Sequence, residues 1–188
     1  SKLTIAVGKK YVALNSFEAP RNIVMYYYPE NTGIEGTAEI DNSLSYDGTS
    51  SLRIDYKFLA NQTTTQSVYG SLENSNIPFP EGVSDFTVWY KGDGSDNLLK
   101  AVINYGNGQS TDVVIADNLN DTQWKQATVT LPSDVTEPVY LNKIYVSSLN
   151  TTDENTEGTV YVDYIMARAA AGTGGGASST NMNDYMEA

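Results

Sequence analysis

The chain has 188 residues, 40% of them hydrophobic and 18% charged, and its 23 acidic and 11 basic residues give a net charge of −12. A surface this acidic repels nucleic acid and anionic lipid, while it suits Ca²⁺, neutral sugars or simple solubility. The sequence contains no Cys and no His. Disulfides, thiol catalysis, the Ser-His-Asp triad and the usual zinc and copper ligands are thereby excluded. We therefore expect a protein that is not an enzyme.

The hydrophobic pattern predicts strands throughout. Apolar residues alternate with polar ones in short segments, and Gly, Asn, Asp and Pro clusters separate these segments. In chain order, strands are predicted at 5–17 (one or two strands around a turn at 8–10), 52–58, 67–73, 86–91, 98–105, 110–116, 123–131, 139–147 and 159–167. No segment has the periodicity of a helix. Eight or more antiparallel strands without intervening helices predict an all-β fold, a β-sandwich jelly roll.

Composition divides the chain into a β-sandwich module at 1–167 and a flexible linker or tail at 168–188. Residues 169–180 are all Ala, Gly, Ser or Thr, a composition that cannot bury enough surface to fold. A module followed by a linker predicts flanking domains in a larger polypeptide. No apolar run reaches the ~20 residues that span a bilayer. Abundant Asn, Thr and Ser without Cys is typical of an exported protein, so we expect a secreted or cell-surface bacterial protein; the alternative is a cytosolic β protein with the same composition.

Three short motifs, far apart in the chain, follow a common pattern. Phe17-Glu18 ends the first strand region, an Asp47-to-Leu52 turn leads into a strand, and Tyr161-Val162-Asp163 lies in the last strand. In this order the motifs resemble the framework of galactose-binding-like jelly rolls, which include many carbohydrate-binding modules. Two further segments, Trp89 to Ser95 and Trp124 to Pro132, strengthen the resemblance. The chain is also similar to accessory domains of bacterial phosphodiester glycosidases and polysaccharide-degrading enzymes, with Tyr28 to Gly33 in place of their Tyr-Pro loop.

This resemblance implies a structural Ca²⁺ ion. Its carboxylate ligands would be Glu18 and Asp163, and the turn that contains Asp47 and Ser50 would complete the shell. Ca²⁺ takes about six to eight oxygen ligands from carboxylates and carbonyls, which agrees with such a set. The alternative is that both acids are ordinary strand-end residues. A second acidic turn, at 92–96, lacks the spacing of a calcium loop and is predicted to be a β-turn.

A sugar site needs aromatic platforms flanked by polar groups on one sheet face. Strand alternation predicts such a face from Tyr69, Trp89, Lys91, Lys100, Asn104 and Tyr145, with Lys143 as an additional candidate. Its basic residues would suit a uronic acid or a phosphate. The alternative places Trp89 and Tyr69 in the core between the sheets.

The run Tyr26-Tyr27-Tyr28 cannot turn all three rings inward on a strand, so at least one ring is predicted to be exposed. It would belong to a binding rim, to a contact with another chain, or to an irregular structural loop. Together, these features predict a non-catalytic accessory module that binds a polysaccharide or oligosaccharide. The alternative is a structural or adhesive surface-protein domain that mediates protein–protein assembly without glycan binding. A small glycosidase that uses carboxylates is a third and weaker alternative.

Overall fold

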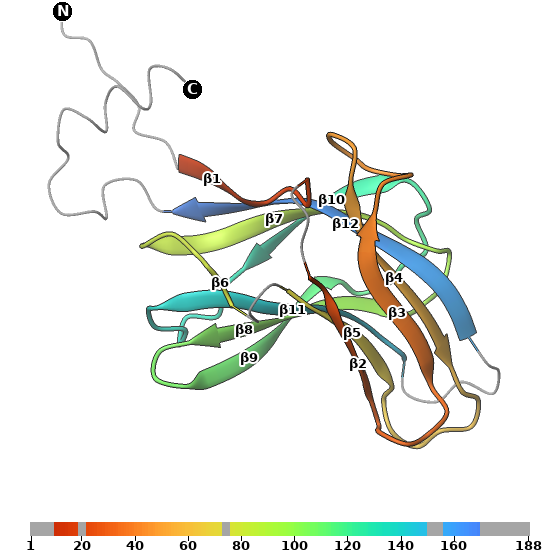
Figure 1. Cartoon of the computed structure of the whole chain (residues 1–188). Coiled ribbons are helices and arrows are strands. Elements are labelled where there is room, and N and C mark those ends of the chain that lie inside the picture. Colours follow the sequence, from red (N-terminus) through yellow and green to blue (C-terminus); the bar gives the residue numbers. More distant parts are fainter. Residues whose placement is uncertain (1–9, 19–21, 73–75, 150–155, 170–188) are drawn as a thin grey trace, which may run out of the picture.

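The computed structural model describes residues 10–18, 22–72, 76–149 and 156–169. No helix occurs in these residues, so none that could cross a membrane. The strands form two six-stranded sheets that pack face to face as a β-sandwich (Figure 1). The all-β sandwich prediction is thus confirmed. Of the predicted tail at 168–188, Arg168 and Ala169 belong to the last strand, and the rest lies outside the described residues.

One sheet, called sheet A, contains both ends of the described chain. Its order is β10 (Trp124–Thr130), β7 (Val83–Lys91), β12 (Thr156–Ala169), β4 (Ser51–Phe58) and β3 (Glu35–Asp41), and β1 (Lys10–Asn15) pairs with the C-terminal half of β12. The long strand β12 lies in the middle of this sheet. It therefore connects most of the sheet through its own hydrogen bonds.

The other sheet, called sheet B, is built largely from the middle of the chain. Its order is β2 (Val24–Tyr28), β5 (Ser67–Ser71), β11 (Val139–Ser147), β8 (Leu98–Tyr105) and β9 (Gln109–Ala116), and the short β6 (Ile77–Pro78) also pairs with β11. All pairings within both sheets are antiparallel.

The core lies between the two sheets and follows the predicted alternation. In β4, Leu52, Ile54 and Phe58 are fully buried, whereas Arg53 and Asp55 on the opposite side are partly exposed. Burial of such side chains is the main favourable term in folding, about 25 cal/mol per Å² of apolar surface. The alternation also leaves one polar face on each sheet, turned toward solvent.

Two edge strands were not predicted from the sequence. In β3 the inward positions include Gly36 and Ala38, which give a weak hydrophobic signal. Space explains these small residues: a Cβ at Gly36 would lie 2.6 Å from a methyl group of Val68 in the opposite sheet. The tyrosine run forms the other unpredicted edge strand, β2, and the two-residue strand β6 was not predicted either.

Candidate functional site

The outer face of sheet B carries a row of tyrosines across neighbouring strands. Tyr26 of β2 pairs with Tyr69 of β5, Tyr69 pairs with Tyr145 of β11, and Tyr145 pairs with Lys100 of β8. Directly opposed positions on antiparallel strands bring side chains into contact, so the pairing alone gathers these rings. We call Tyr26, Tyr69 and Tyr145 the tyrosine row.

Contacts with neighbouring side chains hold the tyrosine row in place. The rings of Tyr69 and Tyr145 lie 4.4 Å apart between centroids, and the Tyr145 hydroxyl donates to Asp112 Oδ2 at 3.0 Å. Burial and the nearby Asp112 carboxylate raise the pKa of Tyr145, and burial also raises that of Tyr69. Both hydroxyls therefore remain protonated at neutral pH. Lys143 Nζ lies 5.7 Å from the Tyr26 ring centroid, within the range of a cation–π contact.

The part of this face formed by β2 is open to solvent. Tyr26 is 50% exposed and Tyr28 is 53% exposed, while Tyr27 between them packs against the core. The prediction of at least one exposed ring in the run is confirmed. Val24 and Val114 on the same face are also exposed. Grouped exposed apolar side chains are typical of a binding surface, whereas scattered ones are not.

The structure brings together four of the predicted ligand residues and separates two. Tyr69, Lys100, Asn104 and Tyr145 occupy the outer face of sheet B, where Asn104 Nδ2 donates to Asn76 Oδ1 at 3.0 Å. Trp89 and Lys91 lie instead in β7 of sheet A. The expectation of one face shared by all six residues is therefore wrong. Each strand's alternation was interpreted correctly, but the assignment of β7 to a sheet was not.

Sequence reasoning left out residues that the structure adds to the face. The sequence predicts exposure in the tyrosine run, with a binding rim as one of three explanations, and it gives no prediction for Asp112. Asp112 sits at an exposed position of β9 and accepts the Tyr145 hydroxyl. Its strand position could have suggested the outer face, but no local signal predicts which neighbour it meets.

A second cluster lies around the turn at 46–50, whose backbone N–H groups contact two of the predicted metal ligands, Asp163 and Glu18. Asp163 is fully buried and accepts the backbone N–H groups of Tyr46 at 2.8 Å and Asp47 at 3.0 Å. Glu18 accepts those of Thr49 and Ser50, each at 3.0 Å from Oε1. A Cβ at Gly48 would overlap the Glu18 carboxylate, so the turn passes very close to this side chain.

The carboxylates at this turn interact with each other and with backbone N–H groups. Burial raises the pKa of Asp163, and the negative charge of Glu18 raises it further, whereas the N–H groups of Ser50 and Thr49 lower the pKa of Glu18. Among the described residues, no Lys or Arg forms an ion pair with either carboxylate. These residues also contain no group of three acidic side chains that could hold a metal. Carbonyl and hydroxyl oxygens of the turn, including that of Ser50, would have to complete a Ca²⁺ shell.

Comparison with known proteins gives a consistent result for the fold. No protein-family model matches the chain, and no curated protein sequence matches it. The family 11 carbohydrate-binding module from Clostridium thermocellum, solved with a β-1,3-1,4-mixed-linked tetrasaccharide, covers 89% of this chain with a TM-score of 0.54 and 16% identity. The alignment covers 99% of that module. The fold is that of the β-sandwich carbohydrate-binding modules.

Two further structures share this module fold. The CBM22-1 xylan-binding domain of Paenibacillus barcinonensis Xyn10C aligns over 87% of this chain and 99% of its own, with a TM-score of 0.50 and 16% identity. The glycoside hydrolase domain of Endo-D from Streptococcus pneumoniae R6 aligns over 77% of this chain but only 21% of its own, with a TM-score of 0.52 and 15% identity. At these identities the likeness establishes the module fold, and function must be argued from the residues.

Proposed function

We propose that the chain is a non-catalytic carbohydrate-binding module of a secreted or cell-surface bacterial protein, and that it holds an oligosaccharide on the outer face of sheet B. The tyrosine row carries this proposal. A tyrosine ring offers a flat apolar face and a hydroxyl at its edge, which matches a sugar ring with apolar faces and hydroxyls at its rim. As an accessory module it would work beside flanking domains of a larger polypeptide.

The charges beside the tyrosine row suggest which sugars it takes. Lys100 and Lys143 lie next to the rings, and the Asp112 carboxylate is already engaged by Tyr145. These ammonium groups would attract a carboxylate on the sugar, although the net charge of the whole chain is negative. We therefore expect an oligosaccharide that contains uronic acid to bind this face at least as well as a neutral one.

The composition of the face supports binding without hydrolysis. A typical glycosidase uses two carboxylates about 5 to 9.5 Å apart across the scissile bond. On the outward strand positions of sheet B that the structure describes, Asp112 supplies a carboxylate without a second one beside it. Stacking rings and basic groups remain, and these bind rather than cleave.

Replacing Tyr26 or Tyr69 by Ala is expected to weaken oligosaccharide binding at least about tenfold, because aromatic rings at the centre of an interface carry much of its energy. Titration calorimetry with a mixed-linked glucan tetrasaccharide, xylotetraose and trigalacturonic acid measures the change. Tyr11→Ala is the matched control, since Tyr11 is 48% exposed but lies in β1 of sheet A.

Equal affinity of Tyr26→Ala, Tyr69→Ala and wild type would contradict the proposal. Failure of all three sugars to bind, together with oligomers that form with increasing protein concentration, would favour the structural or adhesive alternative.

We further propose that Glu18, Asp163 and the turn containing Asp47 and Ser50 hold a structural Ca²⁺ ion. The ion would compensate two neighbouring negative charges, one of them on the fully buried Asp163. It would also connect the chain after β1, the turn before β4 and the last strand. A cation that binds only the folded state stabilises it in proportion to its occupancy.

Removal of Ca²⁺ is expected to lower the melting temperature of the wild type by several degrees, because about 2.7 kcal/mol of stability accompanies a ligand at one hundred times its Kd. Differential scanning calorimetry in millimolar CaCl₂ and in excess EDTA measures the difference. Glu18→Gln should show a much smaller difference, while Asp134→Asn at an exposed loop position should keep it. A wild type that melts at the same temperature in both buffers excludes the site.

A further inference from the structure

The outer face of sheet A carries its own group of aromatic side chains. Tyr46 comes from the turn before β4, Trp89 from β7, Trp124 from β10 and Tyr161 from β12; we call these residues the aromatic cluster. The rings of Tyr46 and Trp89 stack with centroids 3.7 Å apart and planes at 11°. Trp124 lies 6.1 Å from Tyr46 and 6.5 Å from Tyr161. The cluster thus forms one connected group.

Backbone pairing and turn geometry assemble this aromatic cluster. Lys91 of β7 pairs with Trp124 on one side and Tyr161 on the other, which places both rings in one row. The buried Asp163 carboxylate accepts the Tyr46 backbone N–H and so fixes the turn that carries this ring. Arg53 lies 5.9 Å from the Tyr161 ring centroid and is itself paired with Asp41 and Asp55. These rings are therefore held in place before any ligand arrives.

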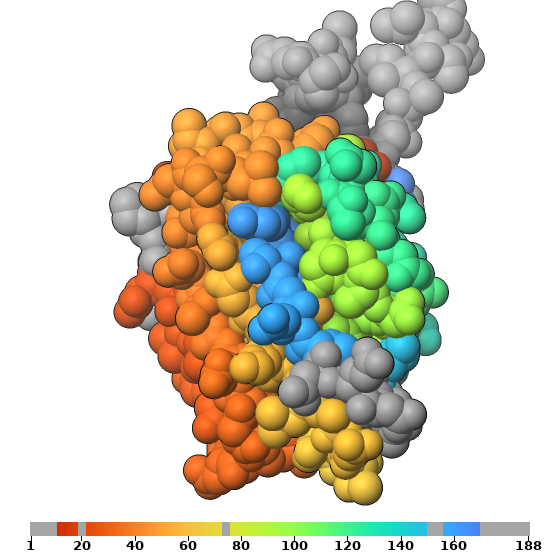
Figure 2. Space-filling model, turned by 90° about the vertical axis from the view of Figure 1, so that its right-hand side faces the viewer, coloured from red at the N-terminus to blue at the C-terminus, as the bar shows by residue number. Residues whose placement is uncertain are grey.

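The cluster has an open surface. Tyr46 is 43% exposed even though one face of its ring rests on Trp89. Figure 2 looks onto this side of the molecule, with β12 in blue between β3 and β4 in orange and β7 in yellow-green. The packing of the rings leaves an aromatic surface turned to solvent rather than a contribution to the core between the sheets.

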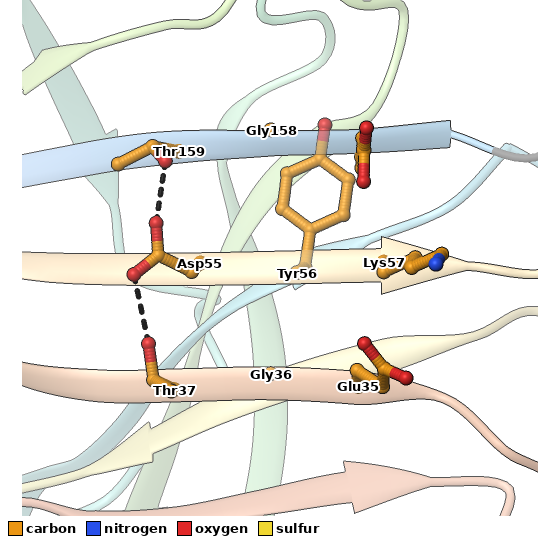
Figure 3. Close-up of a pocket in the computed structure, with 9 residues that line it drawn as sticks. Glu35, Gly36, Thr37, Asp55, Tyr56, Lys57, Gly158 and Thr159 are labelled. Carbon is orange, nitrogen blue, oxygen red and sulfur yellow. Dashed lines mark hydrogen bonds between the residues drawn. The ribbon is translucent and has the colours of Figure 1, made fainter.

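A polar pocket of about 440 Å³ lies on the same face. It sits over the paired row Gly36, Tyr56 and Gly158, between two rows of outward side chains. Asp55 lies in one of these rows, between Thr37 and Thr159, and accepts the hydroxyls of both (Figure 3). Glu35, Lys57 and Glu157 line the other side. Thr159 and Tyr161 are two residues apart on one strand, about 7 Å, so the pocket adjoins the aromatic cluster.

The charges of this face select against anionic ligands. Carboxylates of Glu35, Glu39, Asp41, Asp55 and Glu157 outnumber the basic groups of Arg53, Lys57 and Lys91. Arg53 is paired with two of these acids, and Lys91 Nζ donates to the Thr122 carbonyl at 2.5 Å. A negatively charged sugar or a nucleic acid would meet net repulsion here, whereas a neutral sugar would not.

We propose that the outer face of sheet A is a second carbohydrate-binding surface, specific for a neutral oligosaccharide. Tyr46 and the rings beside it stack one sugar, and the Asp55 carboxylate and the hydroxyl oxygens of Thr37 and Thr159 accept hydrogen bonds from the next sugar. This surface uses no residue of the tyrosine row, so it does not depend on the function proposed for sheet B. The module would then hold two sugar chains on opposite faces.

Tryptophan fluorescence isolates this surface, because the chain has two tryptophans and both, Trp89 and Trp124, belong to the aromatic cluster. Titration of the wild type with a neutral mixed-linked tetrasaccharide or xylotetraose is expected to give a saturable change in emission. Tyr46→Ala should raise the sugar concentration at the midpoint of this change at least about tenfold, and Tyr46→Phe should leave that concentration unchanged. Tyr26→Ala, on sheet B, should leave it unchanged. Circular dichroism confirms that each variant is folded.

The outcomes separate the two surfaces. No change in emission with either neutral sugar, or a midpoint that Tyr46→Ala leaves unaltered, overturns the second surface even if calorimetry detects binding through Tyr26. Emission that varies with protein concentration in the absence of sugar also overturns it, since the rings would then contact another protein molecule. Conversely, a saturable emission change in a protein whose calorimetry is insensitive to Tyr26→Ala would retain this surface and reject that on sheet B.

Discussion

Replacing Gly92 by Ala is expected to destabilise the fold by about 3 kcal/mol, because the new methyl group would overlap backbone rather than flexible side chains. A Cβ at this position would lie 2.5 Å from the carbonyl oxygen of Leu119 and would also overlap that of Asp121. The Leu119 backbone cannot withdraw easily. It is hydrogen-bonded to Gly94 at 2.8 Å and to Ser95 at 3.0 Å, and its side chain is fully buried.

Urea unfolding followed by circular dichroism measures this loss, and Gly70→Ala provides the control. Neither glycine has the positive φ at which Ala itself would be strained. At Gly70 the nearest atom to a new Cβ is a side-chain carbon of Ala38 at 3.3 Å, so the expected change is within about 1 kcal/mol. If the two variants were equally stable, the close approach of the turn after β7 to residues 119–121 would be wrong.

Asp163→Ala is expected to have a comparable effect for a different reason. It removes the acceptor of the backbone N–H groups of Tyr46, Asp47 and Tyr164, the last at 2.7 Å. Each buried donor left without a partner costs about 1 to 3 kcal/mol, and water entering the cavity recovers part of this. A total loss of about 3 kcal/mol would lower the melting temperature by roughly 6 to 12 °C in a domain of this size.

Asp163→Asn is the informative comparison, since its amide keeps one acceptor oxygen and nearly the same volume. Its stability should fall between those of wild type and Asp163→Ala when both are measured by calorimetry in EDTA. Tyr46 is attached to this turn, so Asp163→Ala should also alter the tryptophan emission of the folded protein. Wild-type stability in Asp163→Ala would show that the turn does not need this carboxylate.

The sequence predicts strands well where both chemistry and burial alternate. The strand predicted at 98–105 coincides with β8, and the one predicted at 52–58 lacks only the first residue of β4. It predicts less where the space between the sheets dictates small residues. Gly36 and Ala38 face the opposite sheet in β3, and this need for small side chains is not visible in local propensity.

The residues that share a candidate site are also hard to predict from local sequence patterns. Alternation correctly predicted that Tyr69, Lys100 and Tyr145 lie on the outer side of their strands. The side on which a residue lies depends on its own strand alone. Which strands become neighbours depends on long-range pairing. β7 pairs with β10 and β12, so Trp89 and Lys91 lie in sheet A, on the opposite side of the molecule from the tyrosine row. The pairing of the tyrosine run with β5 was likewise beyond local patterns.

The pairing of β1 with β12 bears on how this module can be joined to other proteins. Lys10 and Ala169 are direct cross-strand partners, so the first and last strand residues lie about 5 Å apart at one end of sheet A. A host protein could receive the module between two adjacent residues of a surface loop with little loop-closure entropy. The outer faces of both sheets would then stay clear of the point of insertion, which lies at one end of sheet A.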